Sequence, residues 1–343
     1  MKENIDTLAL ILLDSLAFLS YNQKREILKN ANNISDILDK EFLLSLPNID
    51  KIDRVIEFLT RENLQKVEQE ISKYTVITYL DENYPDAFWQ LEDYPLCLYC
   101  LGDTTLLQSQ DSLSVVGSRK TLPQVLKFVS LLVKQVAQNR VIICGNTEGV
   151  EQEILSSTMG QNTICFLGGG IEKSFNNKEL FTIAQNGLII TEYYPTHLQK
   201  GYQFIDRNRL IAVLCQEMLL ISGSEKSGVR YTVEFAKQNY KTLYALPYTI
   251  GEPSGELCNE EIKNGAILVN KLQDLVKVEN SRPSLTEQEK IVLSLIEQGT
   301  TQEDFIIEQS NLSVQEVLQI LVTLEIKDYI IKSGATTYAL TKF

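Results

Sequence analysis

The stretch Ser114-Val115-Val116-Gly117-Ser118-Arg119-Lys120 decides the fold of this chain. A β-branched apolar run stops at a glycine, a hydroxyl and two cations follow, and a helical pattern begins near Leu122. A strand, a glycine turn and a helix in this order form an anion site in α/β proteins, because backbone N–H groups and the positive helix end then face a phosphate. Arg119 and Lys120 add full charges. Taken alone, the stretch also fits an ordinary turn with solvated cations.

Composition limits the kinds of protein that this chain can be. It has 343 residues, of which 44% are hydrophobic, and a formal net charge of −13. This acidity excludes a protein that wraps nucleic acid over its whole surface, so any polyanion site must be local. The first residues, Met1–Asp6, carry acids where a signal peptide needs cations, and no apolar run reaches membrane-spanning length. We therefore expect a soluble, cytoplasmic protein that does not associate with membranes.

The cysteines and the single histidine give little support to metal or redox chemistry. Cys97 and Cys100 have CxxC spacing, but no second pair or histidine cluster completes a metal site. They also lie in an extended run, in which residues three apart face opposite sides. We interpret them as packing residues, expect no metal and no cofactor, and expect His197 to be exposed in a loop.

The pattern along the chain predicts three domains, at residues 1–73, 74–280 and 284–343. The first is expected to be a small all-α domain, because short amphipathic segments are broken at Asn30–Asn33 and Leu46–Asn48. The second alternates apolar strands with amphipathic helices, which predicts an α/β fold with an extended Rossmann-like parallel sheet. Its strands are expected at 113–116, 141–144, 163–167, 187–191, 217–221, 242–246 and 266–268, and its helices at 122–138, 150–158, 177–186, 207–214, 230–239 and 256–264.

The residues after each strand carry the functional information, because ligands of such sheets bind beyond the carboxyl ends of the strands. Glycine occurs in four of these turns, which suits a ligand lying against backbone. Neither a G-x-G-x-x-G fingerprint nor a complete Walker loop is present. Phe204 precedes Arg207-Asn208-Arg209, an aromatic and basic cluster of the kind that stacks a base and holds its phosphates.

The sequence pattern of the last domain predicts a winged helix. Capping boxes at Thr286–Glu289 and Ser313–Glu316 open helices, and residues 329–340 alternate as a hairpin. In DNA-binding winged helices the third helix contacts the bases. Here this helix carries Gln315, Glu316 and Glu325 and almost no positively charged residue. We expect a role in protein contact or dimer support.

Several short motifs together resemble the DprA/Smf family of DNA-processing proteins over about residues 75–277. They are Asp81–Pro85, Leu98–Gly102, Val115–Arg119, Gly168–Gly170 ahead of Asn177–Phe181, Glu192-Tyr193, Phe204 with Arg207–Ala212, and Ser227-Gly228. The resemblance implies a Rossmann-like domain, often with a helical N-terminal module and a C-terminal winged helix. It further implies a homodimer without a catalytic cycle that binds and protects single-stranded DNA and loads the RecA recombinase in natural transformation.

This chain departs from the family pattern at positions that bear on the strength of DNA binding. Glu148 stands where the family has an arginine, which reverses a charge at the mouth of the expected site. Lys173-Ser174 replaces a Tyr-Pro pair, Ile205 replaces a proline, and Tyr248 replaces a glycine. We interpret the chain as a diverged member.

The expected DNA contacts follow from the turns and the resemblance together, and no catalytic residue is expected. They are Gly117, Ser118, Arg119, Lys120, Gly168, Gly169, Gly170, Lys173, Phe204, Arg207, Asn208, Arg209, Ser227 and Gly228. Two other classes stay open. One is a Rossmann-like nucleotide-binding enzyme that uses the same pocket, with Glu148 and Glu151 as its carboxylates, and the other is a scaffold that has lost DNA binding. The dimer interface is expected among the apolar positions between Tyr244 and Leu268.

Overall fold

The computed structural model describes residues 2–47, 49, 51–174, 177–275, 285–327, 329–334 and 336–340. The chain divides into two compact units, Met1–Leu275 and Val276–Phe343. The expected boundary near residue 73 lies inside the first unit, and the domain limits stay a prediction. In the described residues, no helix is both long and apolar enough to cross a bilayer.

The first unit is built on a mixed sheet with the strand order β1-β2-β6-β5-β4-β3-β7-β8-β9. Strands β6 to β9 of this order run parallel, whereas β2 is antiparallel to both β1 and β6. The predicted Rossmann-like parallel sheet is therefore confirmed, with an antiparallel extension at one side. The strands are β1 Thr75–Thr78, β2 Cys97–Gly102, β3 Ser112–Val116, β4 Val141–Cys144, β5 Thr163–Phe166, β6 Leu188–Thr191, β7 Glu217–Leu220, β8 Thr242–Ala245 and β9 Ile267–Leu268.

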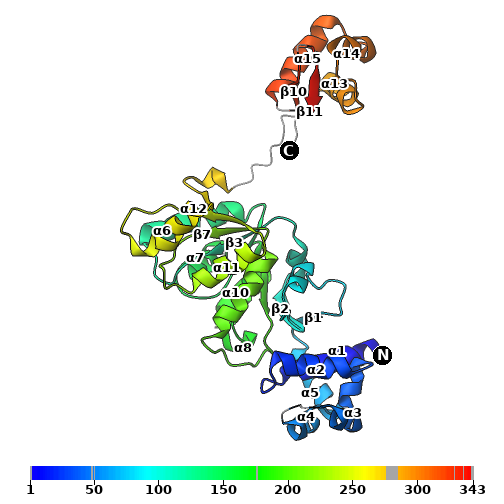
Figure 1. Ribbon diagram of the computed structural model, residues 1–343, viewed down its shortest axis with the longest axis vertical. Helices are drawn as coiled ribbons and strands as arrows, with labels where there is room; N and C mark the ends of the chain where they lie inside the picture. Colours follow the sequence, from blue (N-terminus) through cyan, green and yellow to red (C-terminus); the bar gives the residue numbers. More distant parts are fainter. Residues whose placement is uncertain are drawn as a thin grey trace. The chain divides into compact units, whose positions relative to one another are not determined.

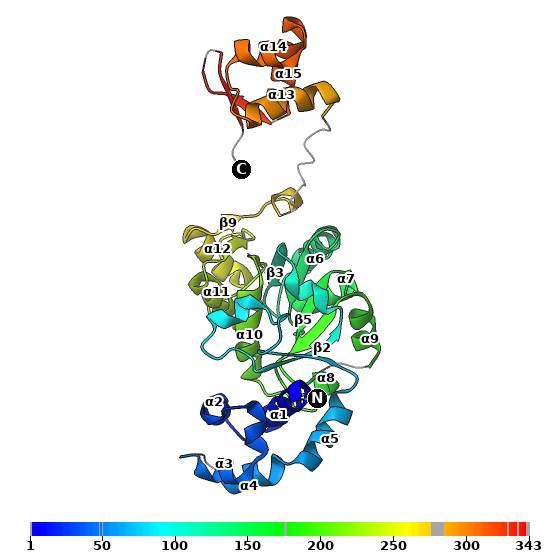
Figure 2. The same ribbon diagram turned by 90° about the vertical axis from the view of Figure 1, so that its right-hand side faces the viewer.

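Helices cover both faces of this sheet, as the two views of the ribbon show (Figures 1 and 2). Helices α6 and α7 pack against each other, as do α10 and α11. Pro123 opens α6, where its missing N–H costs nothing. The helices are α6 Pro123–Val136, α7 Val150–Thr158, α8 Ile171–Ser174, α9 Asn177–Asn186, α10 Gln203–Leu214, α11 Val229–Gln238 and α12 Glu256–Lys263.

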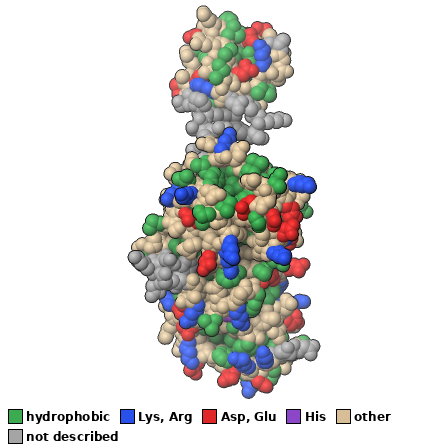
Figure 3. All heavy atoms as spheres, turned by 90° about the vertical axis from the view of Figure 1, so that its left-hand side faces the viewer, with side chains coloured by type: hydrophobic (Ala, Val, Ile, Leu, Met, Phe, Trp, Pro, Cys, Tyr) green, Lys and Arg blue, Asp and Glu red, His purple; other side chains and the backbone are tan. Residues whose placement is uncertain are grey.

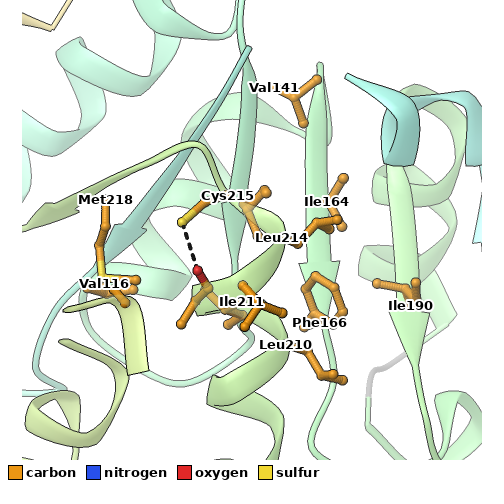
Figure 4. Packing of buried hydrophobic residues seen from close by; sticks show 14 of the residues in the cluster. Val116, Val141, Ile164, Phe166, Ile190, Leu210, Ile211, Leu214, Cys215 and Met218 are labelled. Carbon is orange, nitrogen blue, oxygen red and sulfur yellow. Dashed lines mark hydrogen bonds between the residues drawn. The ribbon is translucent and has the colours of Figure 1, made fainter. Parts of the chain in front are cut away.

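The core of the sheet unit forms where α10 lies against the strands. Leu210, Ile211 and Leu214 of α10 are buried beside Ile164 and Phe166 of β5 (Figure 4). Each fully buried side chain of this size contributes about 1.5–3 kcal/mol of transfer free energy. This packing holds the first turns of α10, which carry Phe204 and Arg207, in a fixed position at the end of the sheet.

The N-terminal helices are fastened to the sheet unit by polar contacts. The Tyr99 hydroxyl donates to Asp14 at 3.0 Å, the Tyr194 hydroxyl donates to Glu70, and Lys73 forms an ion pair with Glu172 at 2.6 Å. The helices are α1 Lys2–Ser15, α2 Tyr21–Asn30, α3 Lys40–Ser45, α4 Ile52–Phe58 and α5 Arg61–Ile71.

Cys97 and Cys100 lie in β2, where both side chains are buried and unbridged. The interpretation of this pair as packing residues is confirmed.

The second unit has its own core between three helices and a hairpin. The predicted capping boxes are present. Thr286 and Glu289 cap the amino end of α13, and Ser313 and Glu316 cap the amino end of α15. The winged-helix prediction is confirmed. The elements are α13 Glu287–Glu297, α14 Glu303–Ser310, α15 Val314–Ile326, β10 Ile330–Lys332 and β11 Tyr338–Leu340.

Candidate nucleic-acid interface

The strand order reverses at β3, because β4 pairs with one side of β3 and β7 with the other. In open α/β sheets the crevice at such a point, beyond the carboxyl ends of the strands, is where ligands bind. A cavity of about 490 Å³ opens there, between the turns that follow β3 and β7. We call it the switch-point cavity.

The switch-point cavity brings together most of the predicted site residues. Thr147 and Thr232 add polar groups that were not expected there, and Glu151, a carboxylate of the enzyme alternative, also lies in the wall. The predicted residues in its wall are Gly117, Ser118, Arg119, Lys120, Phe204, Arg207, Asn208, Ser227 and Gly228.

Two arginines lie near the ring of Phe204. The guanidinium carbon of Arg119 is 5.3 Å from the centroid of the Phe204 ring, and that of Arg207 is 5.9 Å away. Phe204 is half-buried and Arg119 is exposed, whereas Arg207 is only 1% exposed. The ring therefore has one buried cation and one exposed cation near it, and the exposed Arg119 can hold a phosphate while the ring stacks on a base.

Arg207 is fixed by the sheet. Its Nη1 donates to the carbonyl of Phe166 at 3.0 Å, and its Nη2 lies 3.4 Å from Oε2 of Glu151. The guanidinium fits because residue 145 is glycine, where an added Cβ would lie 1.3 Å from Nη1. The sequence suggested Glu151 only as a carboxylate of the enzyme alternative and gave no sign that it is the partner of this arginine.

The amino end of α11 also faces the cavity. Its N-cap residue, Gly228, provides no side-chain cap, and the Val229 N–H donates to the Ser227 hydroxyl at 3.4 Å. Ser227, Gly228 and Val229 lie in the cavity wall. The N–H groups of Arg230 and Tyr231 donate to the carbonyls of Ser227 and Gly228, at 3.1 and 3.2 Å. The positive end of the helix dipole therefore supplies what favours an anion at this place.

The hydrogen bonds of the Ser118 amide contradict one expectation from the sequence. Its N–H donates to both the carbonyl and the hydroxyl of Ser222, at 3.1 and 3.0 Å. It is therefore not free for a phosphate, contrary to the expectation that the backbone of Gly117 and Ser118 binds one. Gly117 has a packing role, because an added Cβ would come within 2.5 Å of Val150.

Gly168, Gly169 and Gly170 lie outside the cavity lining and are buried. The Gly170 N–H donates to the carbonyl of His197, and an added Cβ on Gly170 would meet the carbonyl of Pro195 at 2.3 Å. The prediction that the Gly170 amide holds a phosphate conflicts with this hydrogen bond. Only Gly168 is near the site, in contact distance of the Phe204 ring.

Arg209 and Lys173 do not line the cavity either. The Arg209 guanidinium donates two hydrogen bonds to the Glu192 carboxylate, at 2.7 and 2.8 Å, and its Nε pairs with Asp93. Arg209 is only 6% exposed and binds these carboxylates, so it is not free to bind a phosphate. Arg207, which does line the cavity, is two residues away in the same helix. On a helix this spacing sends side chains to different faces. Lys173 is exposed on α8.

His197 is half-buried, and the expectation of an exposed histidine is wrong. Its ring stacks on Tyr193 with centroids 5.2 Å apart, and its Nε2 lies 2.7 Å from the side-chain amide nitrogen of Gln203. Burial, together with the charge of Lys200, lowers the pKa of His197.

Glu148 is exposed beside the turn that carries Arg119. Its neighbour Gly149 has φ +82°, and an added Cβ there would meet the carbonyls of Arg119 and Ser118 at 2.5 and 2.6 Å. The loop of Glu148 is therefore packed directly on the Arg119 turn.

The cavity is a positive site on an acidic chain. The charges of Arg207 and Glu151 offset each other, whereas Arg119 and Lys120 are exposed and form no ion pair with any residue that the structure describes. Two free cations, the positive end of a helix dipole and a partly exposed aromatic ring suit a phosphate with an attached base.

Comparisons with known proteins agree with this geometry. The sequence profile of the family described as DNA recombination-mediator protein A matches residues 75–280, and that of the DprA winged helix domain matches residues 278–333. The DNA processing protein DprA of Streptococcus pneumoniae is 29% identical over 213 residues, which are 61% of this chain and 75% of that protein.

Two solved structures show the same architecture. The X-ray structure of DprA from S. pneumoniae covers 78% of this chain and 95% of its own, with a TM-score of 0.66 at 24% identity. DNA processing protein A of Helicobacter pylori, whose structure was solved to describe its single-stranded DNA binding mode, covers 59% of this chain and 93% of its own. Its TM-score is 0.53 at 29% identity.

Proposed function

Because the chain belongs to the DNA recombination-mediator protein A family, also called DprA/Smf, we propose that it binds single-stranded DNA in the switch-point cavity. The observation that carries the proposal is the position of Phe204 beside the free guanidinium of Arg119. Single strands are held by such pairs, because every base offers a face for stacking and the backbone offers phosphates to cations.

In this proposal, different groups of the cavity bind the bases and the phosphate backbone. Phe204 supplies the stacking surface, and the buried Arg207 near it makes the electrostatic potential of the cavity more positive. Arg119 and Lys120 bind a phosphate, and the amino end of α11 at Ser227 and Gly228 binds a second one. None of these contacts reads a base edge, so binding is expected to depend little on sequence.

The biological role that we propose is recombination-mediator activity without a catalytic cycle. The family acts in DNA processing and recombination. By protecting incoming single strands and loading a RecA-type recombinase on them in the cytoplasm, the chain would serve natural transformation.

A homodimer is part of this proposal. Ile267 and Leu268 of the edge strand β9 are 48% and 42% exposed, and Ile250 is 98% exposed. Figure 3 shows hydrophobic side chains gathered at the end of the unit where Figure 2 places α12 and β9. Exposed apolar groups beside an open sheet edge are a suitable interface. Sedimentation that finds a monomer at tens of micromolar chain would contradict the dimer.

A mononucleotide is the second candidate ligand, because the cavity volume and the positive end of the α11 dipole suit one. A fluorescence anisotropy titration with labelled single-stranded and double-stranded oligonucleotides, repeated with a nucleoside monophosphate as competitor, distinguishes the functions. We expect preference for the single strand and weak competition. Strong competition favours the nucleotide-binding alternative, and absence of any binding favours the scaffold.

A further inference from the structure

A second cavity lies between helix α2 and the segment that joins β1 to β2. Its volume is about 500 Å³, and it belongs wholly to the first compact unit. Its wall includes Arg25 and Lys29 of α2 together with the rings of Tyr79 and Tyr94. We call this cavity the aromatic groove.

The only tryptophan of the chain stands beside the aromatic groove. Trp89 lies in the short 3₁₀ helix η2 Asp86–Gln90 and is 48% exposed. Its ring centroid is 4.7 Å from that of Tyr94, 5.4 Å from that of Tyr84 and 6.3 Å from that of Tyr79. Because three tyrosines hold the indole, its exposed part is a rigid surface on which another ring can stack at little cost in side-chain entropy.

Two positively charged side chains of α2 lie next to these rings. The guanidinium carbon of Arg25 is 4.9 Å from the centroid of the Tyr94 ring. Lys29 follows Arg25 by four residues, so both side chains lie on one face of α2. Both are exposed, and among the residues that the structure describes neither forms an ion pair, whereas the neighbouring Lys24 pairs with Asp14 at 3.1 Å. Arg25 and Lys29 are therefore available for an anion.

The acidic side chains nearest to the aromatic groove leave this positive charge in place. The Glu26 carboxylate in the wall accepts a hydrogen bond from a side-chain amide one turn further along α2. Asp93 is paired with Arg209 at 2.9 Å. Arg25 donates to the backbone carbonyl of Glu92 at 3.2 Å, and this neutral acceptor does not offset its charge.

Helix α10 connects the aromatic groove with the switch-point cavity. Helix η2 packs against α10, and Arg209 of α10 binds Asp93, the residue before Tyr94. Phe204 precedes Arg209 by five residues, which is about 7.5 Å along the helix axis, and points to another face of the helix. At about 3.4 Å per nucleotide, a strand of on the order of six nucleotides covers the path around a helix about 10–12 Å wide.

We propose that the aromatic groove is a second contact for single-stranded DNA, in which Trp89 stacks on a base and Arg25 and Lys29 bind the adjoining phosphates. This inference rests on the proposed function, because a strand held at Phe204 brings its following nucleotides to the groove. An exposed ring beside an unpaired arginine is the same combination that Phe204 and Arg119 form in the switch-point cavity. The two unpaired cations favour a polyanion over an apolar protein segment.

The fluorescence of Trp89 tests this contact directly, because no other tryptophan contributes to the signal. The full chain is titrated with labelled oligothymidylates of about 4 and about 16 nucleotides, and anisotropy reports saturation. We expect the longer strand to quench the fluorescence several-fold more than the shorter one. A strand of the longer length without bases should leave the fluorescence nearly unchanged at its own saturation. Unchanged fluorescence with the longer oligothymidylate bound overturns the groove contact and leaves the switch-point cavity standing.

Substitutions separate the two sites. Arg25→Ala should weaken binding of the longer strand several-fold and lower its salt slope by about 0.7, without affecting the shorter strand. Arg61→Ala is the matched control, because Arg61 is exposed on α5 and lies outside the groove lining. Trp89→Ala should cause a similar loss, with circular dichroism to confirm folding.

The failure of the groove and the failure of the proposed function give different results. If Arg25→Ala and a folded Trp89→Ala protein bind both strands as the unchanged chain does, the groove contact is overturned. If Arg119→Ala leaves the binding of both strands unchanged while Arg25→Ala weakens it, the groove contact stands and the switch-point cavity is not the DNA site.

Discussion

The guanidinium of Arg119 lies over the ring of Phe204, with its central carbon 5.3 Å from the ring centroid. Arg119 comes from the turn after β3, and Phe204 comes from the first turn of α10. Their contact places a cation that can bind a DNA phosphate next to a ring on which a base can stack.

Replacing Arg119 with alanine should weaken single-strand binding several-fold. The loss of one phosphate contact should also reduce the slope of log affinity against log salt by about 0.7. Arg119 is exposed, so the free energy of unfolding should hardly change. Lys134→Ala is the matched control, because Lys134 is an exposed cation in the last turn of α6 and outside the cavity lining. Unchanged binding by a folded Arg119→Ala protein would place the DNA elsewhere.

Glu148→Arg should tighten single-strand binding. The carboxylate beside the Arg119 turn repels a passing phosphate, whereas an arginine there can make a charge-assisted contact. The salt slope should steepen by about 0.7 for the added contact. Anisotropy titrations at several salt concentrations measure both quantities, with Glu148→Gln separating loss of repulsion from gain of a contact. If affinity and slope are the same in all three proteins, the DNA does not pass Glu148.

Arg209→Ala should destabilise the chain rather than impair DNA contact directly. Removing this arginine leaves the Glu192 carboxylate, which is 14% exposed, without its cation, and such a break costs about 3–5 kcal/mol. Urea unfolding measures the change. Arg230→Ala, which breaks the more exposed pair with Glu260, should cost no more than about 1 kcal/mol. Lost DNA binding at undiminished stability would instead support the original prediction that Arg209 holds a phosphate.

A chain that ends at Leu275 should keep most of its affinity for single-stranded DNA. The switch-point cavity lies wholly within the first compact unit, and α15 offers no cation. Anisotropy titration of the shortened chain, checked for folding by circular dichroism, measures the affinity. Loss of most affinity by a folded, dimeric protein would move the DNA site to the winged helix.

The pKa of His197, which burial lowers, should make the chain less stable in mild acid. Its folded-state pKa lies below the ordinary value of about 6.5, so the unfolded chain binds more protons near that pH, and stability falls as pH drops through it. His197→Gln should flatten this part of the stability profile. Because the chain has one histidine, its NMR titration identifies the group without ambiguity. A titration midpoint at or above the ordinary value would contradict the prediction.

The sequence by itself determined the α/β alternation, the glycine turns and the winged helix. Strand and helix limits could be predicted because hydrophobic periodicity and caps act over a few residues, as at Pro123 and at Ser313 with Glu316. The position of the switch-point cavity could be expected as well, because ligands bind at the carboxyl ends of parallel strands and Gly117 directly follows such a strand.

Only the tertiary structure decided which charges are free. Arg207 and Arg209 look alike in the sequence, yet one lines the cavity beside Phe204 and the other is clamped by Glu192 and Asp93. The N–H groups of Ser118 and Gly170 likewise donate hydrogen bonds to Ser222 and His197, which lie in other segments of the chain. Side-chain pairing depends on how whole elements pack in three dimensions, and no local pattern encodes the partner that packing brings to a charge.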